Sequence, residues 1–93
     1  MANKQPRVAL ITGGTSGIGA GTAKKFADEG WHLILTGRRE DRLNYARDIL
    51  DVPVHTIVAD ITNVGSMTKA LAEIPAPFDE VEVLVNNAGH GIG

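Results

Sequence analysis

The sequence predicts an α/β fold built on a parallel sheet. Short apolar runs alternate with segments of helical periodicity along the chain, and strands that are joined by helices run parallel. The runs show little alternation of apolar and polar residues, which is typical of strands buried on both faces. A glycine-rich segment directly follows the first run. These features predict elements in the order β-α-β-α-β-α-β.

The first two strands and the helix between them follow from local patterns. The run RVALIT, Arg7 to Thr12, is rich in aliphatic residues and stops at glycines, so it predicts the first strand. Ile18 and Phe26 fall at helical spacing, and Gly30 ends that helix. Trp31 to Thr36 (WHLILT) predicts the second strand.

The rest of the chain continues the alternation. A second helix is predicted over Arg39 to Leu50, with Leu43, Ala46 and Leu50 on its apolar face. A third strand follows over Val54 to Ala59, a third helix over Asn63 to Glu73, and a fourth strand over Val81 to Val85. The apolar stripe expected on the third helix consists of Val64, Met67, Leu71 and Ile74.

Right-handed crossovers limit how these strands are arranged. The expected strand order is 3-2-1-4, which is half of a Rossmann-like doubly wound sheet. Because the fourth strand begins the reverse winding, a crevice is expected beside the first strand, where ligands bind in such sheets.

The segment TGGTSGIG, Thr12 to Gly19, lies between the first strand and the first helix. Glycines there permit close approach to the backbone, and free N–H groups at a helix start favour an anion such as a pyrophosphate. The G-x-G-x-x-G pattern would need glycine at Thr22, and a P-loop would need lysine at Ala20. The pattern present is T-G-x-x-x-G-x-G. On its own it is also compatible with a ligand-free turn.

Three features at the carboxyl ends of strands together resemble the short-chain dehydrogenase/reductase family. They are the T-G-x-x-x-G-x-G pattern, Asp60 after the third strand, and the NNAG segment, Asn86 to Gly89, after the fourth. The resemblance covers nearly the whole chain. It implies an oxidoreductase that transfers hydride between a nicotinamide dinucleotide and an alcohol or ketone carbon.

The resemblance also implies which residues hold the cofactor. Thr15 and Ser16 would bind phosphate oxygens, Ile18 would approach the pyrophosphate through its backbone N–H, and Ile61 would line the adenine pocket. The complete set of expected cofactor-binding residues is Gly13, Thr15, Ser16, Gly17, Ile18, Gly19, Arg38, Arg39, Asp60, Ile61, Asn87, Ala88 and Gly89.

The residues after the second strand favour NADP over NAD. Enzymes that use NAD place a carboxylate about 20 residues beyond the glycine loop, where it binds the ribose 2′-hydroxyl. Arg38 stands in that region, and a guanidinium matches the oxygens of a 2′-phosphate. Arg39 is a second candidate. Glu40 and Asp41 are the alternative, since either is a candidate carboxylate for NAD.

Catalytic residues are not expected within the chain. The family uses a Tyr-x-x-x-Lys pair, but the residue four positions after the single tyrosine, Tyr45, is Ile49. The catalytic groups of the family follow the NNAG segment. His32, His55 and His90 are not at metal-ligand spacing, and there is no cysteine, so no metal site is predicted.

Composition narrows the classes of partner. Net charge is −2 and the nine Lys and Arg residues form no stripe, which argues against nucleic acid. No run approaches the ~20 apolar residues of a membrane span, and the N-terminus lacks a secretory apolar region. A cytoplasmic protein is the expectation, in line with the absence of cysteine.

Residues 1–93 are expected to form an incomplete dinucleotide-binding domain, the N-terminal part of a longer one. The alternative is a stand-alone, non-catalytic dinucleotide-binding or interaction module. In either case the fourth strand would have an open edge, and apolar sheet surface would be exposed. We expect that the chain could self-associate through that uncovered surface.

Overall fold

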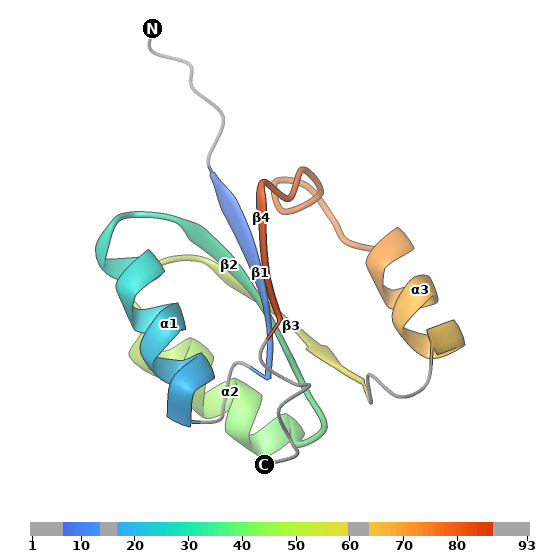
Figure 1. The fold of residues 1–93 in the computed structure, drawn as a ribbon, viewed down its shortest axis with the longest axis horizontal. Helices are drawn as coiled ribbons and strands as arrows, with labels where there is room; N and C mark the ends of the chain where they lie inside the picture. Colours follow the sequence, from blue (N-terminus) through green and yellow to red (C-terminus); the bar gives the residue numbers. More distant parts are fainter. Residues whose placement is uncertain (1–6, 14–16, 60–63, 87–93) are drawn as a thin grey trace, which may run out of the picture.

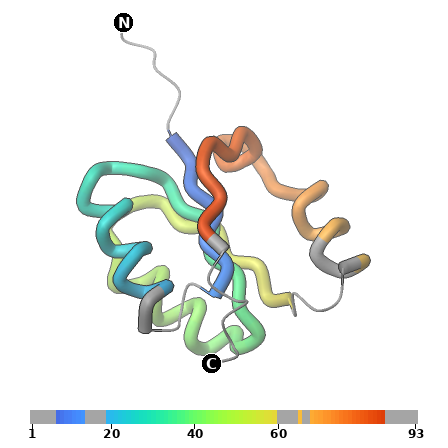
Figure 2. Tube along the Cα trace, in the orientation of Figure 1, coloured from blue at the N-terminus to red at the C-terminus, as the bar shows by residue number. Residues whose placement is uncertain are grey.

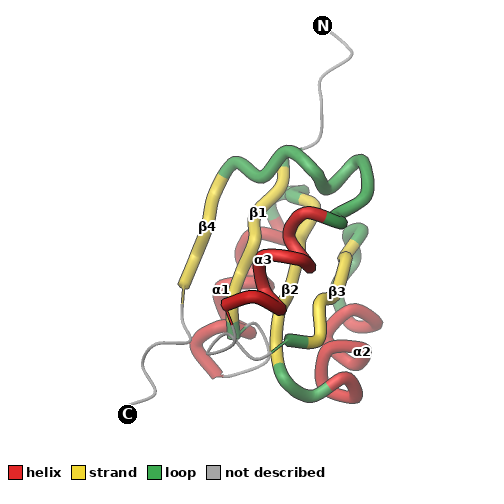
Figure 3. The backbone as a smooth tube through the Cα atoms, turned by 90° about the vertical axis from the view of Figure 1, so that its right-hand side faces the viewer, coloured by secondary structure: helices red, strands yellow, loops and turns green. Residues whose placement is uncertain are grey.

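The computed structural model describes residues 7–13, 17–59 and 64–86, and it confirms the predicted α/β fold. The four strands form one sheet in the order β3-β2-β1-β4 (Figures 1 and 3), and every neighbouring pair is parallel. The elements are β1 (Val8–Thr12), α1 (Gly17–Asp28), β2 (His32–Gly37), α2 (Glu40–Ile49), β3 (Val54–Val58), α3 (Val64–Ala72) and β4 (Val83–Asn86).

Helices α1 and α2 lie on one face of the sheet and α3 lies on the other (Figure 1). Strand β1 lies inside the sheet, and all of its residues are buried. Because side chains alternate along a strand, Ala9 and Ile11 face α1 and α2, whereas Val8 and Leu10 face α3. This two-sided burial explains why RVALIT reads as a continuous apolar run.

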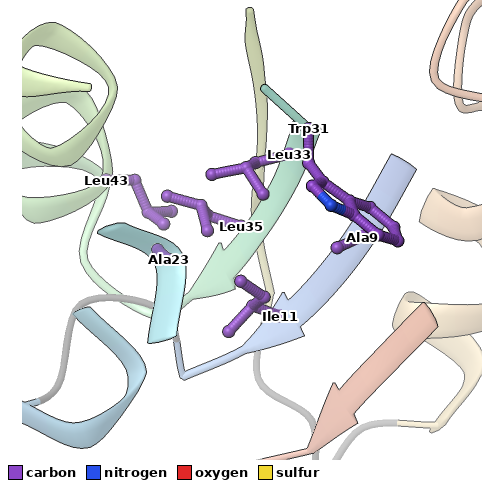
Figure 4. Close-up of a cluster of buried hydrophobic side chains, with 7 residues drawn as sticks. All are labelled: Ala9, Ile11, Ala23, Trp31, Leu33, Leu35 and Leu43. Atoms are coloured by element: carbon purple, nitrogen blue, oxygen red, sulfur yellow. The ribbon is translucent and has the colours of Figure 1, made fainter. Parts of the chain in front are cut away.

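The core on the side of α1 and α2 is the better packed of the two. Leu33 and Leu35 of β2 meet Leu43 of α2 and Ala23 of α1 between the layers (Figure 4). Leu43 is fully buried, and Ala46 and Leu50 pack against the same cluster. The predicted apolar face of the second helix is therefore confirmed, although α2 itself ends one residue before Leu50.

The opposite face is covered more thinly. Ala70 of α3, together with Ile74 and Phe78 of the connection to β4, packs against the buried residues of this face. The predicted position of Ile74 is confirmed, but that of Leu71 is wrong, because Leu71 is 40% exposed. Helix α3 contacts the buried residues of this face through the neighbouring Ala70. The side chains of Val64 and Met67 lie outside the described part.

Among the described residues, strand β4 is an edge of the sheet and pairs only with β1. Val83 and Val85 pack against the core beneath α1 and α2. Leu84 points to the other face and is 62% exposed, because α3 does not reach over it. The described part of the chain thus presents apolar sheet surface to solvent, as the sequence predicts.

Candidate dinucleotide site

The carboxyl ends of the strands meet at one edge of the sheet, at the bottom of Figure 2. Two backbone hydrogen bonds tie these ends together. The Gly13 N–H donates to the Thr36 carbonyl at 3.1 Å, and the Ala59 N–H donates to the Gly37 carbonyl at 2.9 Å. The loops that leave β1, β2 and β3 therefore start side by side, at the edge where ligands bind in doubly wound sheets.

The turn after β1 needs glycine at its first position. Gly13 has a φ of 66°, a left-handed conformation that a side chain disfavours. Helix α1 then begins at Gly17, so Gly17, Ile18 and Gly19 form its first turn. That turn contains no acidic residue, and the first N–H groups of a helix have no intrahelical acceptor. An anion is the ligand that suits such a helix start.

The buried hydroxyl of Thr36 also lies at this edge, and the sequence patterns did not predict its place in the site. Thr36 is fully buried, and its Oγ1 has no hydrogen-bond partner among the described residues. Its register partner in β1 is Thr12, whose Oγ1 donates to the Val85 carbonyl at 3.4 Å. A polar residue that ends an apolar strand is the only signal the sequence offers for Thr36.

Arg38 and Arg39 lie between β2 and α2, and both are exposed. Arg39 Nη2 donates to Asp41 Oδ2 at 3.3 Å, and this hydrogen bond is the main reason that the pKa of Asp41 lies below its usual value. Within the described part of the chain, Arg38 has no ion pair. Glu40 and Asp41 belong to the first turn of α2, whereas β2 ends at Gly37.

Seven of the expected cofactor-binding residues lie outside the described residues, and their expected roles stay predictions. Ala59, the last described residue after β3, immediately precedes two of them in the sequence. Asn86 closes β4 before the last three. The seven are Thr15, Ser16, Asp60, Ile61, Asn87, Ala88 and Gly89.

The two described histidines lie near the starts of their strands, away from this edge. His32 and His55 flank the ring of Phe78, with centroid distances of 5.8 Å and 5.6 Å. Burial lowers the pKa of His55. Tyr45 is 67% exposed on α2.

Across residues 7–13, 17–59 and 64–86, no three His, Asp or Glu side chains gather as metal ligands would. None of the described helices is both long and apolar enough to span a membrane.

A parallel sheet in this order, with a glycine turn at the point where the winding reverses, is the architecture of a dinucleotide-binding domain. Comparison with known proteins makes the assignment narrower. The profile of the short chain dehydrogenase family matches residues 7–93. The chain therefore belongs to the short-chain dehydrogenase/reductase family, as its motifs indicate.

Individual relatives agree with this assignment. Sulfoacetaldehyde reductase 2 of Chromohalobacter salexigens is 49% identical over 84 residues, which are 88% of this chain and 33% of that protein. Serine 3-dehydrogenase of Agrobacterium fabrum is 48% identical over 84 residues, 90% of this chain and 34% of that protein. A closed serine dehydrogenase structure complexed with NADP+ superposes with a TM-score of 0.83 at 35% identity, covering 88% of this chain and 33% of that one. The chain thus spans about a third of the length of these relatives.

Proposed function

We propose that the chain is the N-terminal, cofactor-binding part of an NADP-dependent oxidoreductase that acts on an alcohol or ketone carbon. The observation that carries the choice of cofactor is Arg38. Its side chain is exposed where β2 ends, at the edge that also holds the glycine turn, and it has no ion pair within the described part. A guanidinium in that position suits a 2′-phosphate better than a ribose hydroxyl. When bound, the cofactor accepts the hydride from an alcohol carbon as NADP+ or donates it to a ketone carbon as NADPH.

The residues of this edge fit a dinucleotide. The left-handed Gly13 turn leads to the start of α1, where backbone N–H groups suit a pyrophosphate. The orphaned hydroxyl of Thr36 is a buried polar group at the same edge. We propose that the cofactor is held by Gly13, Thr15, Ser16, Gly17, Ile18, Gly19, Arg38, Arg39, Asp60, Ile61, Asn87, Ala88 and Gly89.

The position of the acidic residues supports NADP over NAD. A carboxylate that selects NAD lies at the end of the second strand. Here Glu40 and Asp41 are already helical, and Asp41 is bound to Arg39. The NADP+ complex of the similar serine dehydrogenase also supports this choice.

We propose a small hydroxy acid as the substrate. The TGRREDRL segment resembles members of the family that act on such acids, and serine, which the similar Agrobacterium enzyme is named for, is a hydroxy acid. We place the protein in the cytoplasm, since it contains no cysteine that would need an oxidising compartment.

The first experiment is to read the coding frame beyond Gly93. A frame that continues to a Tyr-x-x-x-Lys motif supports the proposal. The purified product should then oxidise NADPH in the presence of the oxo form of a small hydroxy acid. A stop codon after Gly93 would refute catalysis by the machinery of this family.

A stand-alone module is the second candidate, and in this case the β4 edge with its exposed Leu84 would be an association surface. In this case NADPH would bind without turnover, and a second copy would associate through the uncovered sheet surface. Sedimentation of the 93-residue chain over a range of concentrations tests this. A monomer at every concentration would exclude self-association.

A further inference from the structure

Arg38 and Arg39 are neighbours, but the two guanidinium groups are in different states. Arg39 is engaged with Asp41 through the 3.3 Å contact between Nη2 and Oδ2. No carboxylate among the described residues pairs with Arg38. The paired side chains are 60% and 70% exposed, so the contact between them lies in solvent at the β2–α2 junction.

The backbone sets the spacing of this ion pair. Arg39 is extended, with φ −110° and ψ 110°, and immediately precedes α2, whose first turn contains Asp41. The Arg39 carbonyl accepts a hydrogen bond at 3.1 Å from the N–H of Leu43, a fully buried residue. The backbone of Arg39 is thus fixed to the core, while among the described residues only Asp41 holds its side chain by a hydrogen bond.

We propose that Asp41 restrains Arg39 and thereby lowers the affinity for the 2′-phosphate, so that Arg38 provides most of the recognition. The inference rests on the proposed NADP dependence. A phosphate and a carboxylate accept hydrogen bonds from the same guanidinium donors, so a bound 2′-phosphate gains Arg39 only by displacing Asp41. Because exposed ion pairs are weak, removing Asp41 should tighten NADPH binding only by about two- to five-fold.

The chain offers a control for simple charge repulsion. Glu40 lies in the same helical turn and, within the described part of the chain, forms no ion pair. Glu40→Gln removes the same negative charge as Asp41→Asn, and it weakens the same interaction with the helix dipole. A gain that depends on freeing Arg39 should appear in Asp41→Asn and be smaller in Glu40→Gln.

The experiment is a set of fluorescence titrations with NADPH and NADH on the whole product of the coding frame. The proteins are the wild type, Asp41→Asn, Arg39→Ala, the double variant and Glu40→Gln, with Asp41→Ala as a second replacement should Asp41→Asn fail to fold. Asp41→Asn should tighten NADPH binding about two- to five-fold and leave NADH binding unchanged. In the Arg39→Ala background the same substitution should tighten NADPH binding no more than Glu40→Gln does in the wild type.

Several results would overturn the inference while leaving the proposed function intact. These are no tightening in Asp41→Asn, an equal gain in the Arg39→Ala background, or an equal gain in Glu40→Gln. A wild-type protein that does not prefer NADPH over NADH would instead refute the proposed NADP dependence, and the role of Asp41 with it.

Discussion

The indole ring of Trp31 stands edge-on to the ring of Phe26, with centroids 4.9 Å apart and an interplanar angle of 79°. The backbone N–H of Trp31 also donates a hydrogen bond to the backbone carbonyl of Phe26 at 3.1 Å. The end of α1 and the start of β2 are thus joined by a ring contact and a backbone hydrogen bond. The guanidinium of Arg7 covers the indole at 4.5 Å and pairs with Glu82 before β4.

Truncation of Trp31 should therefore destabilise the whole sheet. Trp31→Ala removes a 7% exposed side chain from the core, and such a deletion lowers the free energy of unfolding by about 3–5 kcal/mol. Urea unfolding followed by circular dichroism measures this. Tyr45→Ala, at a 67% exposed position, is the control and should change stability by less than about 0.5 kcal/mol. Equal losses in the two variants would contradict this account of the core.

Two glycine substitutions should have opposite effects. Gly30 has a φ of 85°, and a Cβ added there would meet no atom within 4 Å. Gly30→Ala should therefore lower the free energy of unfolding by about 1–2 kcal/mol, because a side chain disfavours this backbone conformation. Gly21 lies exposed within α1 and also has open space around it, so Gly21→Ala should stabilise by about 0.5–1 kcal/mol. Thermal unfolding of both variants tests the pair, and a gain in Gly30→Ala would be inconsistent with the turn.

The order and type of every element were predictable from the sequence, and most boundaries were right within one or two residues. Buried parallel strands are apolar throughout, as RVALIT is, and glycines mark where they end. The face of α3 was less predictable. Leu71 satisfies the helical period as well as Ala70 does, but α3 covers only part of the sheet, so packing of the connection through Phe78 decides which side is buried.

The candidate site was predictable where one residue type carries a conformation or a charge. Gly13 is required by its positive φ, and Arg38 is recognisable as the first of two adjacent cations after a strand. Thr36 was not predictable, because its burial depends on β1 and β3 lying on either side of it. The ion pair that distinguishes Arg39 from Arg38 depends on where α2 begins, which the sequence leaves uncertain by a residue.

Stability should rise with pH through the titration range of His55. Burial lowers the pKa of this imidazole below its usual 6.5, so the unfolded chain binds a proton more readily than the folded chain. The free energy of unfolding therefore falls as pH drops below about 6.5. Urea unfolding at pH 7.5 and pH 5 should show a larger loss in the wild type than in His55→Gln. An equal loss in both proteins would show that other groups cause the pH dependence.

Loss of the Arg38 side chain should separate the two nicotinamide cofactors. Arg38→Ala removes a guanidinium at the end of β2 that has no ion pair among the described residues. Because hydrogen bonds to charged groups contribute about 1.5–3 kcal/mol, binding of NADPH should weaken by about 10- to 100-fold, while binding of NADH should change little. Fluorescence titration of the whole gene product measures both affinities. Arg47→Ala, in the last turn of α2, removes the same charge far from the strand ends and should leave both affinities unchanged. Similar losses of NADPH and NADH binding in Arg38→Ala would remove Arg38 from the recognition of the 2′-phosphate, and the Arg47→Ala result would show whether net charge alone accounts for them.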